Sequence, residues 1–587
     1  MLPRVHFRFV FVLIVWSGLV HLTRTCKEST TCNFTNRKKC MPSDFRCIIY
    51  DNDICDVYQN PLVLTLQEWK FGTRSALLNE FPIDSIKDNY VRQVRNSVFS
   101  ITYPIPLRSK PILAAISDDV LVNILDLDPV VVRSKEFVNF VSGNLVLHGA
   151  VPLTHRYGGH QFGSWAGQLG DGRAVMLGEY INRKGERWEL QLKGSGLTPY
   201  SRRGDGRAVI RSSVREFLCS EALYYLGVPT SRVASLVVSN DPVTRDQFYD
   251  GHPQTERAAV VLRTSPSWFR FGSLEILAKT GEIDLLQQLT DFIIARYFLD
   301  IDPHSDDRYL ELYSVVVEQT ATMIAAWQSL GFTHGVCNTD NFSILSLTID
   351  FGPFGFMEEY NPEFVPNTSD DEGRYSYERQ PDVGYYNLDK LRVALQPLLS
   401  KDQTKQMTTV LKGYVDIYKT KFMENFRRKV GIRQAEDDEQ FIAILLKMME
   451  DAKADFTMTF RQLSERHIND IEKVLTLPDD QAWALKRLAT HDWYDAWVKM
   501  YKTMLMDQHV TESKRQRIMR KANPRYVLRN WMAQRAISQA EHDDFDEINK
   551  VLRVLERPFT FQEEAEANGF ASPPPQWAKH LRVSCSS

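Results

Sequence analysis

The hydrophobic pattern of the chain changes near Ser273. Before this residue, short apolar runs separated by turn signals indicate β-strands. After it, the spacing of apolar residues is helical, and the stretch from Lys401 to Leu477 contains no proline and only two glycines, Gly413 and Gly431. Because proline and glycine interrupt helices, such a stretch favours long helices packed together. This order predicts an α+β protein in which a small β-rich part precedes a larger, mostly helical part.

The β-rich part contains four predicted strands and one predicted helix. A turn signal, Asn182–Gly185, joins the first two strands, and a polar stretch, Asn240–Glu256, predicts a hairpin loop between the last two. The helix covers Ser212–Leu226, where apolar residues recur at helical spacing. The predicted strands are Ala174–Tyr180, Trp188–Leu192, Ala234–Ser239 and Ala258–Arg263.

The composition excludes several classes of protein. Hydrophobic residues make up 43% of the chain and charged residues 25%, which argues against wholesale disorder, collagen and a multi-span membrane protein. Lys plus Arg number 71 and Asp plus Glu 74, for a formal net charge of −3. No global basic excess therefore points to a nucleic-acid partner.

The N-terminus carries one strongly apolar segment, Phe7–Leu22, with Arg4 and Arg8 at its front and no acid before Glu28. It is short for a spanning helix, so no stable membrane span is expected. A secretory signal and an organelle presequence both fit this pattern, and a retained anchor is the third alternative.

Five of the eight cysteines follow this leader and could form a small disulfide module. The sequon Asn33–Thr35 would matter only in the secretory route. We therefore treat residues 1–58 as a leader and Cys-rich appendage. The clustered cysteines are Cys26, Cys32, Cys40, Cys47 and Cys55.

Lys193 ends the predicted strand WELQLK, and Glu216 lies in the predicted helix RSSVREFLCSEAL. A strand Lys paired with a helix Glu is how protein kinases hold the phosphates of ATP. The alternative is a lysine that extends its stem along the surface beside a solvated glutamate.

A second motif reads HGVCNTDN, ending at Asn341, and is followed by Asp350-Phe351-Gly352. Asn341 and Asp350 bracket the strand-like run SILSLTI, so an amide and a carboxylate can converge on one Mg²⁺, which prefers oxygen ligands. In kinases the catalytic Asp lies five residues before the Asn, where this chain has Val336, which cannot accept a proton. The nearest carboxylate is Asp340. Either the chain is an inactive kinase relative, or Asp340 serves a different chemistry; a turn-capping role is the plain structural alternative.

Glycines and arginines form a third element. Backbone N–H groups of Gly170-Asp171-Gly172-Arg173 could approach phosphate, although this tract matches neither the P-loop nor the dinucleotide fingerprint. Many arginines in one region suggest several phosphates to neutralise, with ordinary surface charge as the alternative. The arginines are Arg202, Arg203, Arg207, Arg211 and Arg215, together with Arg263 and Arg270 around the TSPSWF turn.

Three long blocks and the terminal VSCSS make the chain resemble the selenoprotein O family from about Leu64 to Ser587. The blocks are RYGGHQFGSWAGQLGDGRAVMLGE, QLKGSGLTPYSRRGDGRAVIRSSVREFLCSEA and HGVCNTDNFSILSLTIDFGPFGF. The resemblance implies a protein-kinase-like bilobal fold. Residues 59–272 would form an N-terminal extension and the small β-rich N-lobe, and residues 273–587 the large helical C-lobe.

The resemblance also implies an activity. The family is a pseudokinase by motif that binds ATP flipped relative to kinases and transfers AMP to Ser, Thr or Tyr hydroxyls of proteins, releasing pyrophosphate. Its proton acceptor falls on Asp340, its Mg²⁺ ligands (with Mn²⁺ as an alternative ion) on Asn341 and Asp350, and its supporting helix glutamate on Glu216. Its ATP contacts fall on Gly170, Gly172, Arg173, Lys193, Asp205, Gly206, Arg263, Arg270 and Asp350.

Two departures from the family pattern concern the C-terminus and the leader. Many animal members carry selenocysteine where this chain has Cys585, so the redox candidate is an ordinary thiol. Bacterial relatives can pair this Cys with one after Asp-Phe-Gly, but Glu358–Asp371 contains no Cys here. Animal members are mitochondrial, whereas this leader fits the secretory pathway equally well. An ordinary phosphotransferase and a non-catalytic nucleotide-binding redox scaffold that works through Cys585 remain as alternative functions.

Overall fold

The computed structural model of the protein describes residues 61–71 and 75–584. The leader, the five clustered cysteines and Cys585 lie outside the described residues. The predictions made for them therefore stay predictions.

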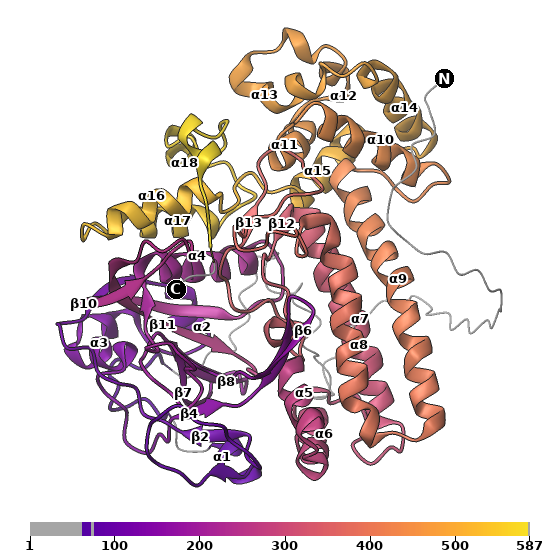
Figure 1. The fold of residues 1–587 in the computed structure, drawn as a ribbon. Helices are drawn as coiled ribbons and strands as arrows, with labels where there is room; N and C mark the ends of the chain where they lie inside the picture. The colour runs from indigo at the N-terminus through magenta and orange to yellow at the C-terminus, as the bar shows by residue number, and fades with distance from the viewer. Residues whose placement is uncertain (1–60, 72–74, 585–587) are drawn as a thin grey trace. The chain divides into compact units, whose positions relative to one another are not determined.

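A mixed sheet forms the centre of the β-rich part (Figure 1). Neighbouring strands pair antiparallel except the first two, which are parallel. The spatial order is β1 (Ile83–Asp84), β2 (Phe99–Ile101), β4 (Leu153–His155), β7 (Ala174–Ile181), β8 (Arg187–Lys193), β11 (Gln254–Ser265), β10 (Arg232–Arg245) and β3 (Ile112–Ile116), with β9 (Ala208–Val209) on β11. Two further pairs stand apart from this sheet: β5 (Gly158–Gln161) with β6 (Ser164–Gln168), and β12 (Phe332–Thr333) with β13 (Gly355–Phe356).

The predicted hairpin of β7 and β8 is confirmed. The side-chain oxygen of Asn182 accepts the backbone N–H groups of Lys184 and Glu186 at 3.1 and 2.9 Å. Gly185 adopts a φ of +80°, which glycine tolerates without the penalty that a side chain would bring. The local turn chemistry therefore explains why the strands meet in this register.

The predicted hairpin of β10 and β11 is confirmed, but both strands are longer than predicted, so the loop covers residues 246–253 and not all of Asn240–Glu256. After a register shift between Val238 and Pro242, exposed and buried residues alternate along β10. Because polar residues occupy exposed positions in this half of β10, its sequence resembled that of a loop. The carboxylate of Asp241 accepts the backbone N–H groups of residues 108 and 109 at 2.7 and 2.6 Å, which stabilises the irregular point.

The predicted helix is confirmed as α4 (Ile210–Tyr225), and it packs against β10 and β11. Its side chains Phe217 and Leu218 are fully buried. Within the β-rich part, α1 (Ala76–Glu80), α2 (Asp118–Asn123), η1 (Pro129–Arg133) and α3 (Lys135–Ser142) accompany the sheet. A hydrophobic core joins α2 and α3 to the sheet through residues such as Leu121, Phe137 and Leu262.

The remainder of the described chain is predominantly helical, as predicted. The helices α7 and α9 pack side by side, with α8 against both (Figure 1). Ser400 and Gln403 form a capping box at the start of α9, and Gly431 ends it in the left-handed conformation. The α-helices are α5 (Phe271–Thr280), α6 (Ile283–Tyr297), α7 (Arg308–Leu330), α8 (Gln380–Leu395), α9 (Lys401–Val430), α10 (Asp438–Asp451), α11 (Phe456–Glu465), α12 (Ile468–Ile471), α13 (Asp479–Leu488), α14 (Tyr494–Asp507), α15 (Glu512–Ala522), α16 (Asn530–Ala540), α17 (Asp546–Leu555) and α18 (Glu563–Ala567). The short 3₁₀ helices are η2 (Thr339–Asn341), η3 (Tyr377–Arg379), η4 (Gln396–Leu398), η5 (Val474–Thr476) and η6 (Gln576–His580).

The run SILSLTI is not a strand, which corrects the prediction. A tight turn closes it: the backbone N–H of Ser346 donates to the carbonyl oxygen of Ser343 at 3.0 Å, and Ser346 has a φ of +51°. Only isolated bridges remain, including one between Phe342 and Thr348 across the turn. The apolar side chains of this run enter the core from a loop. Their apolar character in the sequence therefore resembled that of a buried strand.

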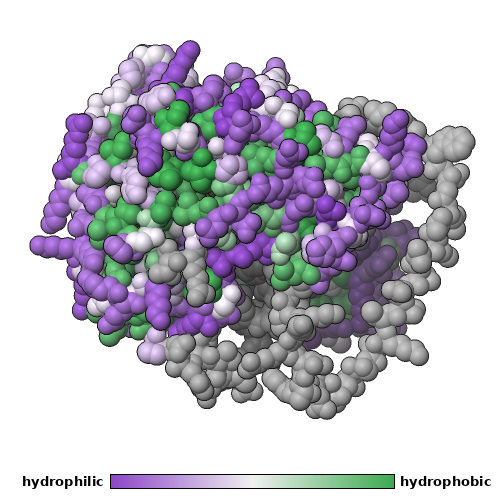
Figure 2. Space-filling model, turned by 90° about the horizontal axis from the view of Figure 1, so that it is seen from below, coloured by the Kyte–Doolittle hydropathy of each residue, from purple (hydrophilic) through white to green (hydrophobic). Residues whose placement is uncertain are grey.

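The outer surface mixes residue types. On the face in Figure 2, areas of hydrophobic residues are interrupted by hydrophilic ones. Exposed large apolar side chains include Tyr249 in the loop between β10 and β11, Leu299 after α6, and Trp577 in η6, so they are far apart along the chain. In the part of the chain that the structure describes, no helix is both long enough and apolar enough to cross a bilayer.

Candidate active site

Asp350 is the centre of a cluster of cations. It follows the turn described above and adopts a φ of +60°, which is uncommon for a residue with a side chain. Its carboxylate accepts a hydrogen bond from Lys193 Nζ at 3.1 Å and shorter ones from Arg263 Nη1 and Arg270 Nη1. Because these cations come from β8, from β11 and from the residue before α5, they bring three elements to one carboxylate.

Glu216 of α4 completes the cluster. Its carboxylate pairs with Lys193 Nζ through one oxygen and with Arg263 Nη1 at 2.8 Å through the other. The strand Lys and helix Glu that the sequence predicted are therefore in contact. Gln191 adds support, since its side-chain oxygen accepts both Nε and Nη2 of Arg263 at 2.8 and 2.6 Å.

Further buried charges belong to this cluster. Arg173 belongs to it electrostatically: burial lowers its pKa, while the charges of Glu216 and Asp350 raise it. Burial also lowers the pKa of Lys193, against the opposing effect of the same two carboxylates. The surrounding cations overcome the effect of burial on Asp350 and hold its pKa well below the ordinary value. With Arg263 and Arg270 included, four cations surround Glu216 and Asp350, and the buried carboxylates of Asp171 and Asp340 also interact electrostatically with this cluster. Four cations gathered at one place favour a polyanion such as a triphosphate.

Asp340 lies in η2 and is buried. Its Oδ2 accepts a hydrogen bond from Gln161 Nε2 at 3.2 Å, and its Oδ1 has no partner among the described residues. Burial raises the pKa of Asp340 to about 7, and the neighbouring positive charge of Arg270 works against that rise. A carboxylate with one free oxygen and a pKa near neutrality is suited to accept a proton.

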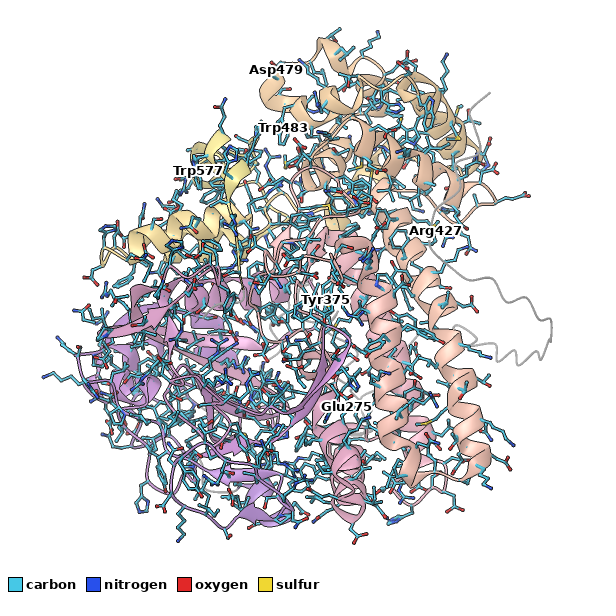
Figure 3. All side chains as sticks on the ribbon, viewed as in Figure 1. Glu275, Tyr375, Arg427, Asp479, Trp483 and Trp577 are labelled. Carbon is cyan, nitrogen blue, oxygen red and sulfur yellow. The ribbon has the colours of Figure 1, made fainter. Side chains whose placement is uncertain are left out.

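The tip of the β5–β6 hairpin covers the loop that carries Asp340. The backbone N–H of His160 donates to the hydroxyl of Thr339 at 2.7 Å, and that of Phe162 donates to the hydroxyl of Tyr375 at 2.9 Å. Tyr375, labelled in Figure 3, donates in turn to the side-chain oxygen of Asn338 at 2.5 Å. The hairpin and the loop are thus joined by buried hydrogen bonds.

The hairpin also explains why glycine occupies position 159. A Cβ built there would lie 2.6 Å from Asp340 Oδ1, closer than van der Waals contact allows. Glu275 of α5 anchors the same strand, with its carboxylate 2.6 Å from His160 Nδ1 (Figure 3). The sequence prediction missed Gln161, His160, Glu275 and Tyr375. The tract YGGHQFG was the available signal, but only its glycines were interpreted.

Asn341 follows Asp340 directly. Its Nδ2 donates to the carbonyl oxygen of Val336 at 2.9 Å. Val336 stands where kinases have their catalytic base, and here its backbone orients the amide of Asn341. The amide oxygen of Asn341 and the carboxylate of Asp350 are the donors that Mg²⁺ prefers. Among the described residues, no three His, Cys, Asp or Glu side chains gather into a metal site of their own. The donor set therefore fits a Mg²⁺ ion that is held partly by substrate phosphates. The carboxylate of Asp350 would then serve both the ion and the basic side chains that contact it.

Two predicted nucleotide contacts lie outside the charge cluster. The exposed carboxylate of Asp205 pairs with Arg245 at 2.6 Å and accepts the backbone N–H of Arg207 at 2.8 Å. Gly206 is required by close packing, since a Cβ there would lie 2.0 Å from the carbonyl oxygen of Gly196. Asp205 and Gly206 as ATP contacts therefore stay predictions.

Gly170 and Gly172 lie beside Tyr200. A Cβ at Gly170 would meet the Tyr200 ring at 2.5 Å, and one at Gly172 would meet its carbonyl oxygen at 2.7 Å. Close packing thus accounts for both glycines without a ligand. Their predicted contact with ATP is not tested by this packing.

Three of the five arginines between Lys193 and Glu216 have structural partners. Arg207 donates to the carbonyl oxygen of Pro106, and Arg211 pairs with Glu256 at 2.8 Å. The guanidinium of Arg215 donates to the carbonyl oxygens of residues 352 and 354. The structural alternative thus explains these three, while Arg202 and Arg203 are exposed.

Comparisons with known proteins identify the family of this chain. The protein nucleotidyltransferase YdiU of Azoarcus sp. (strain BH72) is 43% identical over 517 residues, which cover 87% of this chain and 98% of that protein. The protein of the same name from Xanthomonas campestris pv. campestris (strain B100) is 44% identical over 492 residues, 84% of this chain and 93% of that protein. The sequence model of the protein adenylyltransferase SelO family matches residues 87–556. The chain therefore belongs to the protein adenylyltransferase SelO family and is an enzyme of the nucleotidyltransferase class.

Proposed function

We propose that the protein transfers AMP from ATP to hydroxyl groups of Ser, Thr or Tyr side chains in other proteins. The observation that carries this proposal is the buried carboxylate of Asp340, whose Oδ1 has no partner among the described residues. Arg270 links this acid to the cation cluster, because its Nη1 donates to the carbonyl oxygen of Asp340 at 2.6 Å and also to Asp350.

In the proposed reaction, Asp340 accepts the proton of the substrate hydroxyl as its oxygen attacks the α-phosphorus of ATP. The bond between the α-phosphorus and its bridging oxygen breaks, and pyrophosphate leaves. Lys193, Arg263 and Arg270 neutralise charge that builds up on the phosphates, and they are already ordered by Glu216 and Asp350. When bound, Mg²⁺ would add further charge neutralisation, held by Asn341 and Asp350.

The arrangement also supports a protein-kinase-like bilobal fold in which ATP donates AMP and not its γ-phosphate. The contact of Lys193 with Glu216 and the position of Asp350 correspond to the kinase parts that hold ATP. The kinase base is replaced by Val336, which offers only its carbonyl oxygen. An acceptor at Asp340 is consistent with ATP bound in the flipped orientation, with the α-phosphorus facing the hydroxyl.

Transfer of label from two forms of ATP tests the proposal. The protein is incubated with Mg²⁺, a mixture of proteins and ATP labelled at either the α- or the γ-phosphorus. Protein label from α-labelled ATP that is lost in Asp340→Asn supports AMP transfer, and Asp495→Asn, an exposed acid on α14, is the matched control. Label from γ-labelled ATP would instead identify a phosphotransferase. No protein label from either form would contradict the proposal.

We propose a mitochondrial location, which rests on the family resemblance and the Arg-bearing, acid-free start of the chain. N-terminal sequencing of the mature protein, together with its glycosylation state at Asn33, distinguishes this location from the secretory pathway. A mature chain glycosylated at Asn33 would contradict it.

A further inference from the structure

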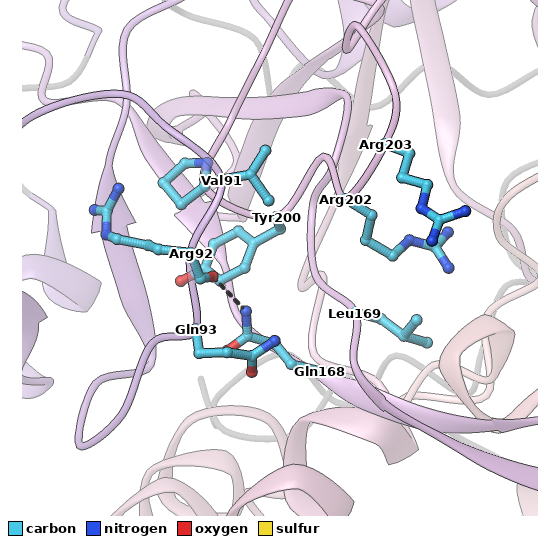
Figure 4. Close-up of a pocket in the computed structure, with 9 residues that line it drawn as sticks. Val91, Arg92, Gln93, Gln168, Leu169, Tyr200, Arg202 and Arg203 are labelled. Atoms are coloured by element: carbon cyan, nitrogen blue, oxygen red, sulfur yellow. Dashed lines mark hydrogen bonds between the residues drawn. The ribbon is translucent and has the colours of Figure 1, made fainter.

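An open cavity of about 360 Å³ lies beside the turn that holds Gly170 and Gly172 (Figure 4). Its lining includes Val91, Gln93, Leu169, Tyr200, Arg202 and Arg203. A second cavity of about 250 Å³ has Arg95, Trp165 and Lys279 in its lining. Gln93 and Gln168 line both cavities, so the two cavities are neighbours, and we call them together the basic groove.

The floor of the basic groove is held by Gln168 of β6. Its side-chain oxygen accepts the backbone N–H of Val94 at 2.8 Å, and its Nε2 donates to the carbonyl oxygen of Arg92 at 2.9 Å (Figure 4). One side chain thus ties an extended segment to the hairpin strand. The groove is therefore a preformed feature of the fold, positioned by the same hairpin that covers Asp340.

Arg202 and Arg203 stand at the edge of the groove. They occupy the middle of a turn in which the backbone N–H of Gly204 donates to the carbonyl oxygen of Ser201 at 2.8 Å. The hydroxyl of Ser201 donates to the carbonyl oxygen of Gly172, which anchors this turn. Both arginines are exposed, and neither guanidinium has a hydrogen bond or ion pair with any residue that the structure describes.

The rest of the groove is also positively charged. The Arg95 side chain is 61% exposed, and its guanidinium is 4.0 Å from Glu282. Glu282 is already engaged, because Arg156 pairs with it at 2.6 Å. Lys279 extends over the ring of Trp165, with its ammonium 5.8 Å from the ring centre. Four exposed cations therefore lie along the groove, and the nearby carboxylate serves another partner.

The groove lies next to the proposed reaction centre. Trp165 of β6 pairs with His160 of β5, and the rings are 5.3 Å apart. The β5 residues Gly159 and Gln161 contact Asp340, whereas β6 lines the groove. Neighbouring strands are about 5 Å apart, so one hairpin separates the groove from the acid.

We propose that the basic groove binds an acidic segment of the protein substrate and so selects hydroxyl groups with Asp or Glu nearby. This inference rests on the proposed function. Four cations spread over two neighbouring cavities match an extended chain of carboxylates better than one compact phosphate. The apolar side chains of Val91 and Leu169 provide a surface for the CH₂ groups of the bound Asp and Glu side chains. Charge complementarity of this kind contributes mainly to partner selection.

Peptide binding tests the proposal independently of catalysis. The full chain is titrated into two fluorescein-labelled peptides, one with a central Ser and Tyr flanked by Glu and one flanked by Lys. We expect tighter binding of the Glu peptide. Salt should weaken this binding, and Arg202→Glu/Arg203→Glu should weaken it about tenfold, because two attractive charges are replaced by two repulsive ones. Arg553→Glu/Arg557→Glu, two exposed arginines at the C-terminal end of α17, is the control with the same change of charge.

Three outcomes would overturn the inference. The first is equal binding of both peptides by the wild-type chain. The second is equal loss of Glu-peptide binding in the control variant, which would mean a non-specific charge effect. The third is a loss of ATP binding in Arg202→Glu/Arg203→Glu with peptide binding unchanged, which would place these arginines in the nucleotide site.

AMP transfer separates this inference from the proposed function. If the wild-type chain labels proteins from α-labelled ATP, the Arg202→Glu/Arg203→Glu variant should raise the KM for the Glu peptide at least tenfold and leave the KM for ATP unchanged. If the wild-type chain transfers no AMP at all, the proposed function fails, and the peptide titration still decides whether the groove binds acidic segments.

Discussion

Arg270 holds the backbone of Asp340: its Nη1 donates to the carbonyl oxygen of Asp340 at 2.6 Å while it also donates to the carboxylate of Asp350. One guanidinium thus couples the proposed proton acceptor to the cation cluster. Both bonds come from the single atom Nη1, whose two N–H groups are fixed in the plane of the guanidinium. A lysine carries the same charge, but its ammonium rotates freely on a flexible stem and does not hold two acceptors in fixed directions.

We therefore expect Arg270→Lys to lower kcat for AMP transfer about 100-fold, the range found when one preorganised donor is removed from a reaction centre. Initial rates with α-labelled ATP measure the effect. Arg257 lies on the same strand as Arg263 but is half-buried and pairs with Asp543, away from the cluster. Arg257→Lys should therefore leave the rate unchanged. Equal rates for Arg270→Lys and wild type would contradict the proposed arrangement.

A methyl group at position 159 should disturb Asp340 directly. The Cβ of Gly159→Ala would lie 2.6 Å from Asp340 Oδ1, so either the hairpin or the carboxylate must shift. We expect at least a tenfold loss of AMP transfer, since a small misplacement at a reacting group can cost about 100-fold. The control is Gly413→Ala, where a Cβ meets nothing within 4 Å in the middle of α9. It should retain activity and raise stability by up to about 1 kcal/mol in urea unfolding.

Tyr375 offers a test of the hairpin contact. Tyr375→Phe removes the hydroxyl that accepts from Phe162 and donates to Asn338, so the hairpin should open more often. We expect faster hydrogen exchange at residues 158–168 and a loss of stability of about 1–2 kcal/mol. Tyr360→Phe is the control, because Tyr360 is a buried residue whose hydroxyl makes no hydrogen bond with a described residue. Unchanged exchange in the hairpin would show that Tyr375 does not hold it.

Lys429 gives a prediction about pH. It is buried with its ammonium 4.2 Å from the ring centre of Phe460, and burial lowers its pKa from 10.5 to about 7. In the unfolded chain Lys429 keeps its proton up to about pH 10.5, so folding releases a proton between these values. The penalty on stability is therefore full below pH 7 and disappears as the pH rises towards 10.5.

Lys429→Met should thus stabilise the protein at pH 6, by a free energy on the order of 4 kcal/mol, and much less at pH 10. Urea unfolding at the two pH values measures the difference. Lys412→Met, an exposed lysine on the same helix, should give no such pH-dependent gain. A gain for Lys429→Met that is equal at both pH values would contradict a lowered pKa for Lys429.

Elements governed by local chemistry were predictable from the sequence. The turn at Asn182–Gly185, the helix α4 and the capped helix α9 all occur where expected, because neighbouring residues supply their hydrogen bonds and spacing. Predictions failed where burial came from distant parts of the chain. The run SILSLTI is apolar because it enters the core as a turn. The polar half of β10 is part of a strand whose residues are alternately exposed and buried.

The candidate site divides in the same way. The sequence by itself determined which groups are available: Lys193 at a strand end, Glu216 on a helix, and Asp340 beside Asn341 before Asp350. Only the tertiary structure decided that three cations converge on Asp350 and that a hairpin buries Asp340 with one oxygen free. These contacts join residues up to 179 positions apart. Periodicity and turn signals describe neighbours along the chain, whereas burial and charge depend on what the folded chain brings together.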